Sequence, residues 1–400
     1  MTGPRVFFYC SDEPGNLQED VIALAEGLSE LGVSFHANCD YWLQSTKPRD
    51  YLLRRSPDIT AEDCDIVVVS YTWVQWVRMG DFELRRRPLP EGLFKPGRRY
   101  VTVAMDNGDG YRTISWQERF RPFDLILRSK FNCRAAAPAN MRPWAYGLTN
   151  RVVKATQNLS PFSQRANSVL VNFNVSHPFR YGARDLAARR FEPQIGAVLA
   201  VDRTRDDLSR EPSDPYAALM WRQTGGRFSR DYYERLKRSK AVACFCGDII
   251  PPAPHCPESY LVGGNRARLR RAFFAALGLF DSRPPRAVGA DSFRFWEALA
   301  AGCAAINIDL EHYGVTMPVM PRNGVHYLGV NFARVKDFIE KLREDVGLLE
   351  HVAAQGRAWA QTYYSPKAVA ERLLAMAGRS AATVPARPSA AVIGNIANIA

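Results

Sequence analysis

Short apolar runs alternate with helix-like segments along the first 150 residues, and this alternation limits the possible folds more than any other feature. Residues 5–10 (RVFFYC) form an apolar run after Arg5, which is typical of a strand buried on both faces. Residues 17–32 then repeat apolar side chains at helical spacing and end at Gly32, a common helix terminator. The later strand-like runs are 33–37, 65–71, 99–105 and 124–129. Strands that alternate with helices predict an α/β fold with a parallel sheet between helices.

The strand pattern stops once and starts again, which predicts two domains. Residues 143–166 have weak apolar periodicity and contain turn residues, whereas a strand-like run resumes at 168–175. A length of 400 residues also suits two domains, at roughly 150 residues each. The expected segments are a first domain at 1–150, a second domain at 166–365, a C-terminal helix within 366–378 and a disordered tail at 379–400.

Positive charge is concentrated in the second part of the chain. Residues 1–150 carry 19 Lys and Arg against 19 Asp and Glu, whereas residues 151–400 carry 34 against 22. The second part therefore accounts for the whole net charge of +12. Such an excess indicates an anionic partner, either nucleic acid or a phosphorylated small molecule, or else a solubilising surface.

Two polar loops, 11–16 and 106–111, follow predicted strands at the sheet edge where open α/β sheets bind ligands. Their acidic residues could hold a hydroxyl-rich substrate or accept a proton from it, although Asp also favours turns for structural reasons. These candidates are Asp12, Glu13, Asp106 and Asp109. The GxGxxG dinucleotide fingerprint is absent after the first strand, which argues against a nicotinamide enzyme, and the P-loop pattern is absent too.

Basic residues in the second part offer a phosphate site and a weaker nucleic-acid hypothesis. His177, Arg180 and Arg184 surround a predicted helix start, where arginines and amide groups can bind phosphate, although a solvated helix face is an equal alternative. The segments 230–240 and 263–271 are also basic. Their aromatic residues do not interleave as a base-stacking platform would, so we expect no nucleic-acid partner.

Residues 291–314 (DSFRFWEALAAGCAAINIDLEHYG) are the most informative stretch for function. Asp291 or Ser292 can cap a helix that ends at Gly302, and a buried strand follows. Glu297 is an isolated acid in this apolar helix, three residues after Arg294, and it needs a polar partner. A carboxylate accepts two hydrogen bonds, which suits a vicinal diol such as the ribose of a nucleotide.

The order of these motifs resembles the donor-binding half of GT-B glycosyltransferases, and it is most similar to the exostosin-like group and bacterial group 1 relatives. The residues that carry the resemblance are a helix from Tyr233 to Ser239, a strand at 241–246, Gly247, an insertion, and Ser292-x-Arg294-x-x-Glu297-Ala298-Leu299-Ala300-Ala301-Gly302-Cys303. The resemblance implies two Rossmann-like domains that face each other across a cleft. It also implies that the acid at Glu297 binds the donor's ribose, and that the small residues ending at Gly302 let the helix end approach the donor.

The chain departs from that pattern at two places. Group 1 transferases often carry a second Glu eight residues before the ribose-binding acid, where this chain has Gly289. An insertion between Gly247 and Asp291 is also atypical of the family. The donor-sugar contacts and the stereochemical outcome are therefore left open.

The resemblance implies a glycosyltransferase that moves a sugar from a nucleotide diphosphate donor to a hydroxyl-bearing acceptor. The second domain would bind the donor and the first the acceptor, without a metal or other cofactor. The expected catalytic residues are Asp106, His177, Asp12 and Glu13. The expected donor-binding residues are Glu297, Ser292, Arg294, Asp291, Arg180, Arg184, Gly247, Gly302 and Asp109. The alternative is a non-catalytic protein of the same fold that binds a nucleotide or polyanion.

The remaining sequence features favour a cytoplasmic protein. No run of about 18 apolar residues predicts a membrane helix, and the N-terminus does not resemble a signal peptide. The eight cysteines are irregularly spaced, which favours reduced thiols over a disulfide framework or a zinc site.

Overall fold

Six parallel strands form the N-terminal sheet in the computed structural model of the chain. The structure describes residues 3–13, 17–78, 83–108, 117–172, 181–250 and 284–383. In order across the sheet, the strands are β10 (Met141–Pro143), β9 (Leu125–Arg128), β8 (Val101–Asp106), β5 (Ile66–Val69), β1 (Val6–Tyr9) and β2 (Phe35–Ala37). The five strand-like runs predicted in this part each contain or overlap one of these strands, and β10 is an addition.

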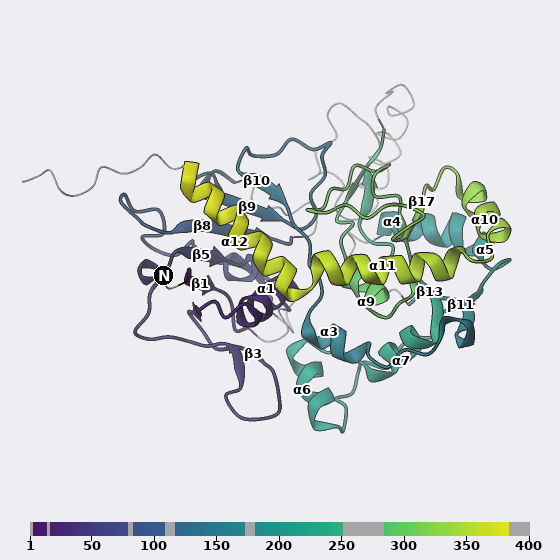
Figure 1. Cartoon of the computed structure of the whole chain (residues 1–400), viewed down its shortest axis with the longest axis horizontal. Coiled ribbons are helices and arrows are strands. Elements are labelled where there is room, and N and C mark those ends of the chain that lie inside the picture. The colour runs from purple at the N-terminus through teal and green to yellow at the C-terminus, as the bar shows by residue number, and fades with distance from the viewer. Residues whose placement is uncertain are drawn as a thin grey trace, which may run out of the picture.

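A second parallel sheet, of five strands, forms the core of the C-terminal half (Figure 1). In order across the sheet, they are β12 (Ala200–Asp202), β11 (Ala166–Leu170), β13 (Ser239–Ala243), β16 (Ala304–Ile308) and β17 (Leu328–Val330). The sequence-based fold class, two Rossmann-like α/β units, is confirmed. In each sheet the first strand is second from one edge, and the chain reverses its direction of winding there, which is the point where such sheets bind ligands.

Three short antiparallel pairs lie outside the two main sheets. They are β3 (Tyr41–Leu43) with β4 (Tyr51–Leu53), β6 (Gln75–Arg78) with β7 (Glu83–Arg86), and β14 (Asp248–Ile250) with β15 (Arg286–Val288). The pair β14–β15 brings together the two ends of the predicted insertion, whose residues 251–283 lie outside the described part of the chain.

Helices cover the sheets, and polar side chains cap the first turn of some of them. The α-helices are α1 (Glu19–Glu30), α2 (Tyr71–Val74), α3 (Asn150–Ala155), α4 (Tyr181–Leu186), α5 (Glu192–Ile195), α6 (Pro215–Gln223), α7 (Arg230–Arg238), α9 (Phe293–Ala300), α10 (Val335–Glu344), α11 (Leu348–Tyr364) and α12 (Pro366–Thr383). The side chain of Asp214 caps α6, and that of Ser229 caps α7. Within the described residues, no helix has both the length and the apolar character needed to cross a bilayer.

The last two helices connect the halves. Helix α11 packs on α9 and β16 of the C-terminal half, and α12 then crosses to α1 and β8 of the N-terminal half (Figure 1). Gly27 of α1 allows this crossing, since a Cβ there would lie 1.9 Å from the carbonyl oxygen of Pro366. Helix α12 continues to Thr383, past Gly378, and Ala377 is its last residue with an assigned buried side chain. The rest of the expected tail, residues 384–400, lies outside the described part.

Polar side chains from the N-terminal half also bind the backbone of the C-terminal half. The Asn132 amide donates to the carbonyl oxygens of Ala287 and Tyr313, both at 2.8 Å. The neighbouring Arg134 donates to the carbonyl oxygens of Pro285 and His312 at 2.6 and 2.7 Å. These contacts fix the loop after β9 against the other half, so the halves meet through specific polar contacts as well as apolar packing.

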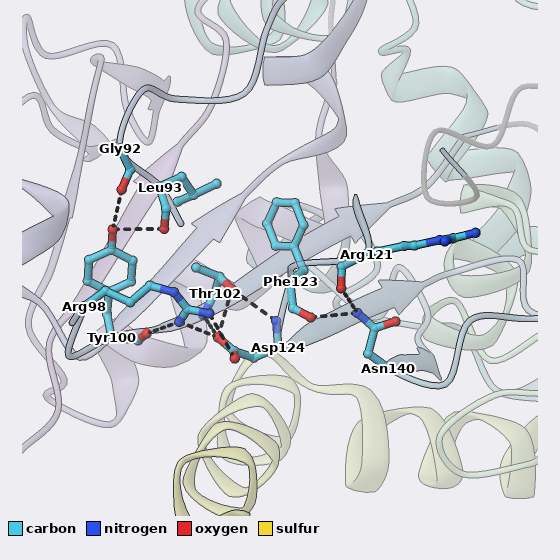
Figure 2. Close-up of polar contacts among 9 residues, drawn as sticks. All are labelled: Gly92, Leu93, Arg98, Tyr100, Thr102, Arg121, Phe123, Asp124 and Asn140. Atoms are coloured by element: carbon cyan, nitrogen blue, oxygen red, sulfur yellow. Dashed lines mark hydrogen bonds and ion pairs between the residues drawn. The ribbon is translucent and has the colours of Figure 1, made fainter. Parts of the chain in front are cut away.

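A polar cluster stabilises the N-terminal sheet at the edge where its strands begin (Figure 2). Both Asp124 carboxylate oxygens accept hydrogen bonds from the Arg98 guanidinium, at 2.9 and 3.1 Å. The backbone amide and hydroxyl of Thr102 donate to the same carboxylate at 2.7 and 2.8 Å. Thr102 lies near the start of β8, and Asp124 directly precedes β9. This cluster is thus at the opposite edge from the strand ends that bind ligands in open α/β sheets.

Candidate functional site

A cleft of about 340 Å³ lies between the two halves and is lined by residues of both. The N-terminal half contributes Leu17, Lys130 and Tyr146, whereas most of the other lining residues come from the loops and helices of the C-terminal half. This volume is within the range of about 300–1,000 Å³ that small-molecule and cofactor sites occupy. Four residues from the start of α9 and the residues just before it also line the cleft: Asp291, Ser292, Arg294 and Glu297.

Both oxygens of the Glu297 carboxylate accept hydrogen bonds from tyrosines. The Tyr233 hydroxyl donates to Oε1 at 2.8 Å, and the Tyr232 hydroxyl donates to Oε2 at 2.9 Å. Tyr232 and Glu297 line the cleft, whereas Tyr233 is buried behind them with an exposed fraction of 3%. Burial and the neighbouring Glu297 raise the pKa of both tyrosines well above the usual range, so both hydroxyls stay protonated donors.

Arg151 extends this network into the N-terminal half. Its Nη1 donates to the Tyr233 hydroxyl at 2.7 Å, and its Nη2 forms an ion pair with Glu19 of α1. Burial alone would lower the pKa of Arg151, but Glu19, Tyr233 and Glu297 together raise it above its usual value. We call the continuous set Glu19, Arg151, Tyr233, Glu297 and Tyr232 the cross-domain network.

Asp291 fixes the start of α9. Its Oδ1 accepts from the Trp296 indole at 2.8 Å, and its Oδ2 accepts from the backbone amide of Tyr146 at 3.1 Å. Burial raises the pKa of Asp291 to about 7, and these hydrogen bonds oppose that shift. Asp291 therefore ties α9 to the segment that links the two halves.

Asn107 is the centre of a second polar group, on the N-terminal side of the cleft. Its backbone carbonyl accepts from the Lys130 ammonium at 2.8 Å, and its side-chain amide donates to Asp20 at 3.2 Å. The Lys130 ammonium also lies 5.5 Å from the centre of the Tyr146 ring, within cation–π range. Burial raises the pKa of Asp20 to about 6. The result is a cation from the N-terminal half that lines the cleft and is only 9% exposed.

Further polar residues form the C-terminal wall of the cleft. Asp206 accepts from Asn172 at 3.1 Å and from Ser229 at 2.8 Å, and it forms an ion pair with Arg235 at 2.5 Å. This arrangement connects the loop after β12 to the cap of α7. Two exposed arginines, Arg205 and Arg227, line the cleft nearby. Cations from both halves thus border one cavity.

Ser292 carries a hydroxyl with no partner among the described residues. It occupies the N-cap position of α9, but its side chain makes no capping hydrogen bond. Its Oγ is buried and unpartnered, and the residue lines the cleft. Ser229, by contrast, uses its hydroxyl to cap α7. A buried hydroxyl without a partner is costly, so Ser292 is a group that a ligand would satisfy.

The structure brings only part of the predicted donor site together. Asp291, Ser292, Arg294 and Glu297 lie in one cleft, as the predicted helix requires. Gly302 lies at the other end of α9, where its carbonyl accepts from Arg165 at 2.6 Å. The expectation that this helix end approaches the donor is therefore corrected, because the N-terminal end of α9 faces the cleft.

Gly247 and Arg184 also lie outside the cleft lining. Gly247 has a φ of +79°, and a Cβ there would lie 2.1 Å from the carbonyl oxygen of Val288. This glycine is thus required where β14 approaches β15. Its carbonyl accepts from the backbone amide of Ala183 in α4, next to Arg184. Three further predicted residues, His177, Arg180 and Asp109, lie outside the described part of the chain.

The predicted acids Asp12, Glu13 and Asp106, which belong to the described part of the N-terminal half, are not among the residues that line the cleft. Asp106 is 1% exposed, and its Oδ1 accepts from Arg128 at 2.8 Å and from the Gly108 amide at 3.0 Å. A buried ion pair of this kind explains Asp106 as a structural residue. Asp12 is exposed beyond β1, and the backbone amide of Glu13 is bound by the Ser11 hydroxyl.

Sequence reasoning missed the residues that reach the cleft from distant segments. Tyr232 of α7, Arg151 of α3 and Lys130 of the loop after β9 are far apart in sequence, and local spacing does not indicate that they meet. Arg151 had one available signal, a lone arginine beside an apolar Val-Val pair in the segment that links the domains. Within the described residues, no three His, Cys, Asp or Glu side chains form a group that could hold a metal ion.

Comparisons with known proteins identify the fold. No protein-family model matches the chain, and no curated protein matches it in sequence. An α-glucosyltransferase in complex with UDP and a 13-mer DNA has a TM-score of 0.50 and 9% identity, over 94% of this chain and 99% of the other. A glycosyltransferase from Rickettsia africae ESF-5 has a TM-score of 0.50 and 9% identity, over 95% and 99%.

One of these similarities contradicts a prediction from the sequence. We expected no nucleic-acid partner because the basic segments lack interleaved aromatic residues. The α-glucosyltransferase of this fold is bound to DNA. A second complex of it, with UDP and mismatched DNA, has a TM-score of 0.50 and 8% identity, over 94% of this chain and 100% of the other. The exclusion is therefore wrong, since a stacking platform is only one way to bind nucleic acid, and phosphate contacts are another. Taken with the paired parallel sheets and the cleft between them, the similarities show that this chain has the GT-B fold.

Proposed function

We propose that the protein is a glycosyltransferase that moves a sugar from a nucleoside diphosphate donor to a hydroxyl-bearing acceptor. The observation that carries this proposal is the composition of the cleft. A carboxylate, Glu297, lies beside Arg294 on one helix, and Lys130 faces them from the other half. A site for a nucleotide sugar needs hydrogen-bond acceptors for the ribose hydroxyls and cations for the diphosphate.

Glu297 is the proposed ribose ligand. Its carboxylate is half-buried in the cleft wall, and hydrogen bonds from two tyrosines hold it in place. A held carboxylate can accept hydrogen bonds from ribose hydroxyls without losing side-chain entropy on binding. UDP is the first nucleotide to test, because the α-glucosyltransferase of the same fold is bound to it.

The diphosphate is proposed to lie at the N-terminal end of α9. Arg294 is in the first turn of this eight-residue helix, and the unpartnered Ser292 hydroxyl precedes it. A helix N-terminus favours negative charge, and a cation on the same turn adds to that preference. This assignment replaces Arg184, which does not line the cleft. Negative charge grows on the leaving diphosphate during transfer, so these groups would lower the barrier.

The acceptor side of the proposal remains broad. The hydroxyl-bearing acceptor includes nucleic acid, since the exposed Arg205 and Arg227 at the cleft could contact phosphates. Asp12 and Glu13 stay predicted bases for an inverting reaction. We propose that the reaction needs no metal ion or other cofactor and that the protein is cytoplasmic. Both parts of the proposal rest on the sequence alone. A non-catalytic nucleotide-binding protein of the same fold is the alternative.

A donor panel tests the proposal directly. Purified protein is mixed with UDP-, GDP-, dTDP- and CMP-sugars, with and without EDTA, and both the melting temperature and slow donor hydrolysis are followed. We expect stabilisation by one ribonucleotide family, lost in Glu297→Ala and kept in Glu340→Ala, an exposed acid on α10. Donor hydrolysis would favour the enzyme over the binding protein. Stabilisation that is equal in wild type and Glu297→Ala would refute the ribose role.

A further inference from the structure

The two tyrosines bound to Glu297 differ in what else holds them. The Tyr233 hydroxyl donates to Oε1 and also accepts from Arg151 at 2.7 Å. Arg151 is buried and paired with Glu19, so Tyr233 cannot move away without leaving this cation short of an acceptor. The Tyr232 hydroxyl has Glu297 Oε2 as its hydrogen-bond partner among the described residues. Tyr233 is thus held on two sides and Tyr232 on one.

The two tyrosines also differ in their access to the cleft. Tyr232 lines the cleft together with Glu297, whereas Tyr233 is only 3% exposed and packs against Phe228. A ligand in the cleft therefore reaches Glu297 from the side where the Tyr232 hydroxyl lies. Oε1 of Glu297 therefore accepts from Tyr233, which is buried away from the cleft, and Oε2 accepts from Tyr232, which borders the cleft.

We propose that Tyr233 is a positioning residue for Glu297 and that Tyr232 is an exchangeable cover, whose hydroxyl gives up Oε2 to a ribose hydroxyl of the donor. This inference rests on the proposed function. It makes the nucleotide compete with a side chain of the protein for one carboxylate oxygen. The two neighbouring tyrosines then have opposite effects on donor affinity, although they contact the same carboxylate.

The backbone supports this division of roles. Both tyrosines are in the first turn of α7, whose cap is formed by Ser229. The Ser229 hydroxyl accepts from the Tyr232 amide at 3.2 Å and donates to Asp206 at 2.8 Å. The main chain of Tyr232 is therefore fixed, so only its side chain needs to turn. Tyr232 is partly buried and borders the cleft, so its side chain can turn into the cavity without a movement of the main chain.

The test measures UDP affinity by titration calorimetry for matched Tyr→Phe variants of the full chain. Tyr232→Phe removes the competing hydroxyl, and we expect UDP to bind roughly twofold to tenfold more tightly, the scale of one exchanged hydrogen bond to a charged group. Tyr233→Phe frees the Glu297 carboxylate and removes the acceptor of Arg151 Nη1, and we expect binding roughly tenfold weaker or worse. The exposed Tyr363→Phe on α11 controls for the substitution itself.

A second pair of variants links the gain to Glu297. Tyr232→Phe combined with Glu297→Gln should show no gain over Glu297→Gln alone, because the competition requires the carboxylate. Melting curves test whether Tyr233→Phe is folded at the titration temperature. If it is unfolded, the comparison of Tyr232→Phe in the wild-type and Glu297→Gln backgrounds decides alone.

The possible outcomes separate this inference from the proposed function. Weaker UDP binding by Tyr232→Phe would overturn the inference alone, since the hydroxyl would then be a ligand of the nucleotide. A loss of the same size in both tyrosine variants would do the same. Failure of the wild type to bind any nucleotide of the panel would overturn the proposed function and the inference with it.

Discussion

Arg151 occupies the centre of the cross-domain network, and its replacement by methionine should strongly destabilise the protein. The side chains of Arg151 and Glu19 are 6% and 4% exposed. Removing one partner of a buried ion pair leaves the other charge uncompensated, which typically costs about 3–5 kcal/mol. Methionine keeps most of the side chain's apolar length, so little of the loss would come from a cavity. We therefore expect the free energy of unfolding to fall by about 3–5 kcal/mol.

Urea denaturation at pH 7, followed by tryptophan fluorescence, measures this loss. The matched control is Arg189→Met, because Arg189 and Asp185 form an ion pair at 3.9 Å with side chains 79% and 52% exposed. Loss of such an exposed pair should cost about 0–1 kcal/mol. Arg151→Met combined with Glu19→Gln should recover part of the stability, because no buried charge is then left alone. A loss below about 1 kcal/mol in Arg151→Met would refute the reasoning, since a buried pair would then behave like an exposed one.

Three further predictions concern Asp291, Ser292 and Asp124. Burial raises the pKa of Asp291 from 3.8 to about 7. The protonated carboxyl therefore contributes its full stabilisation below about pH 4, and this contribution is lost as the pH rises through 7. Asp291→Asn should reduce the fall in unfolding free energy between pH 4 and 8, by about 4 kcal/mol at most. An unchanged pH profile in denaturant titrations of this variant would count against the assignment. Ser292→Ala should weaken UDP binding roughly threefold to thirtyfold in calorimetry while the melting temperature stays within a few degrees, whereas equal affinity would show that no ligand uses this hydroxyl. Asp124→Ala removes the acceptor of the cluster in Figure 2 and should lower the unfolding free energy by about 2–4 kcal/mol without changing UDP affinity, and a change in affinity would contradict its placement far from the cleft.

The fold could be predicted because its signals are local. The runs at 5–10, 65–71 and 99–105 are mostly apolar, which matches strands that are buried on both faces. Helix α9 could likewise be predicted from its cap residues, its apolar face and the glycine after it. β10 could not, because its three residues end in a proline and carry little apolar signal.

The site could be predicted only where it lies within one element. Asp291, Ser292, Arg294 and Glu297 follow from the helix that carries them, since helical spacing places them on neighbouring turns. The tyrosines that bind Glu297 lie 64 and 65 residues earlier in the chain. Periodicity carries no information about such pairs, so the sequence indicated a basic helix at 230–240 without connecting its tyrosines to Glu297.

Acidic loop residues illustrate the opposite error. Asp106 follows a buried strand at the ligand-binding edge, which favoured a catalytic role. The structure gives it a buried guanidinium partner from the neighbouring strand, Arg128, and excludes both from solvent. A position in sequence cannot distinguish an acid that faces a ligand from one that faces the next strand, because both positions follow the same strand end.

The cross-domain network has a consequence for how the two halves cooperate. Glu19 belongs to the N-terminal half and Glu297 to the C-terminal half, and Arg151 with Tyr233 connects them through buried hydrogen bonds. Any change in the relative position of the halves would thus alter the geometry of the proposed ribose ligand, since a buried partner cannot be replaced by water at low cost. Donor affinity and the arrangement of the halves are in this way two aspects of one equilibrium, and a nucleotide that prefers the positioned carboxylate would stabilise the contact between the halves by the same free energy.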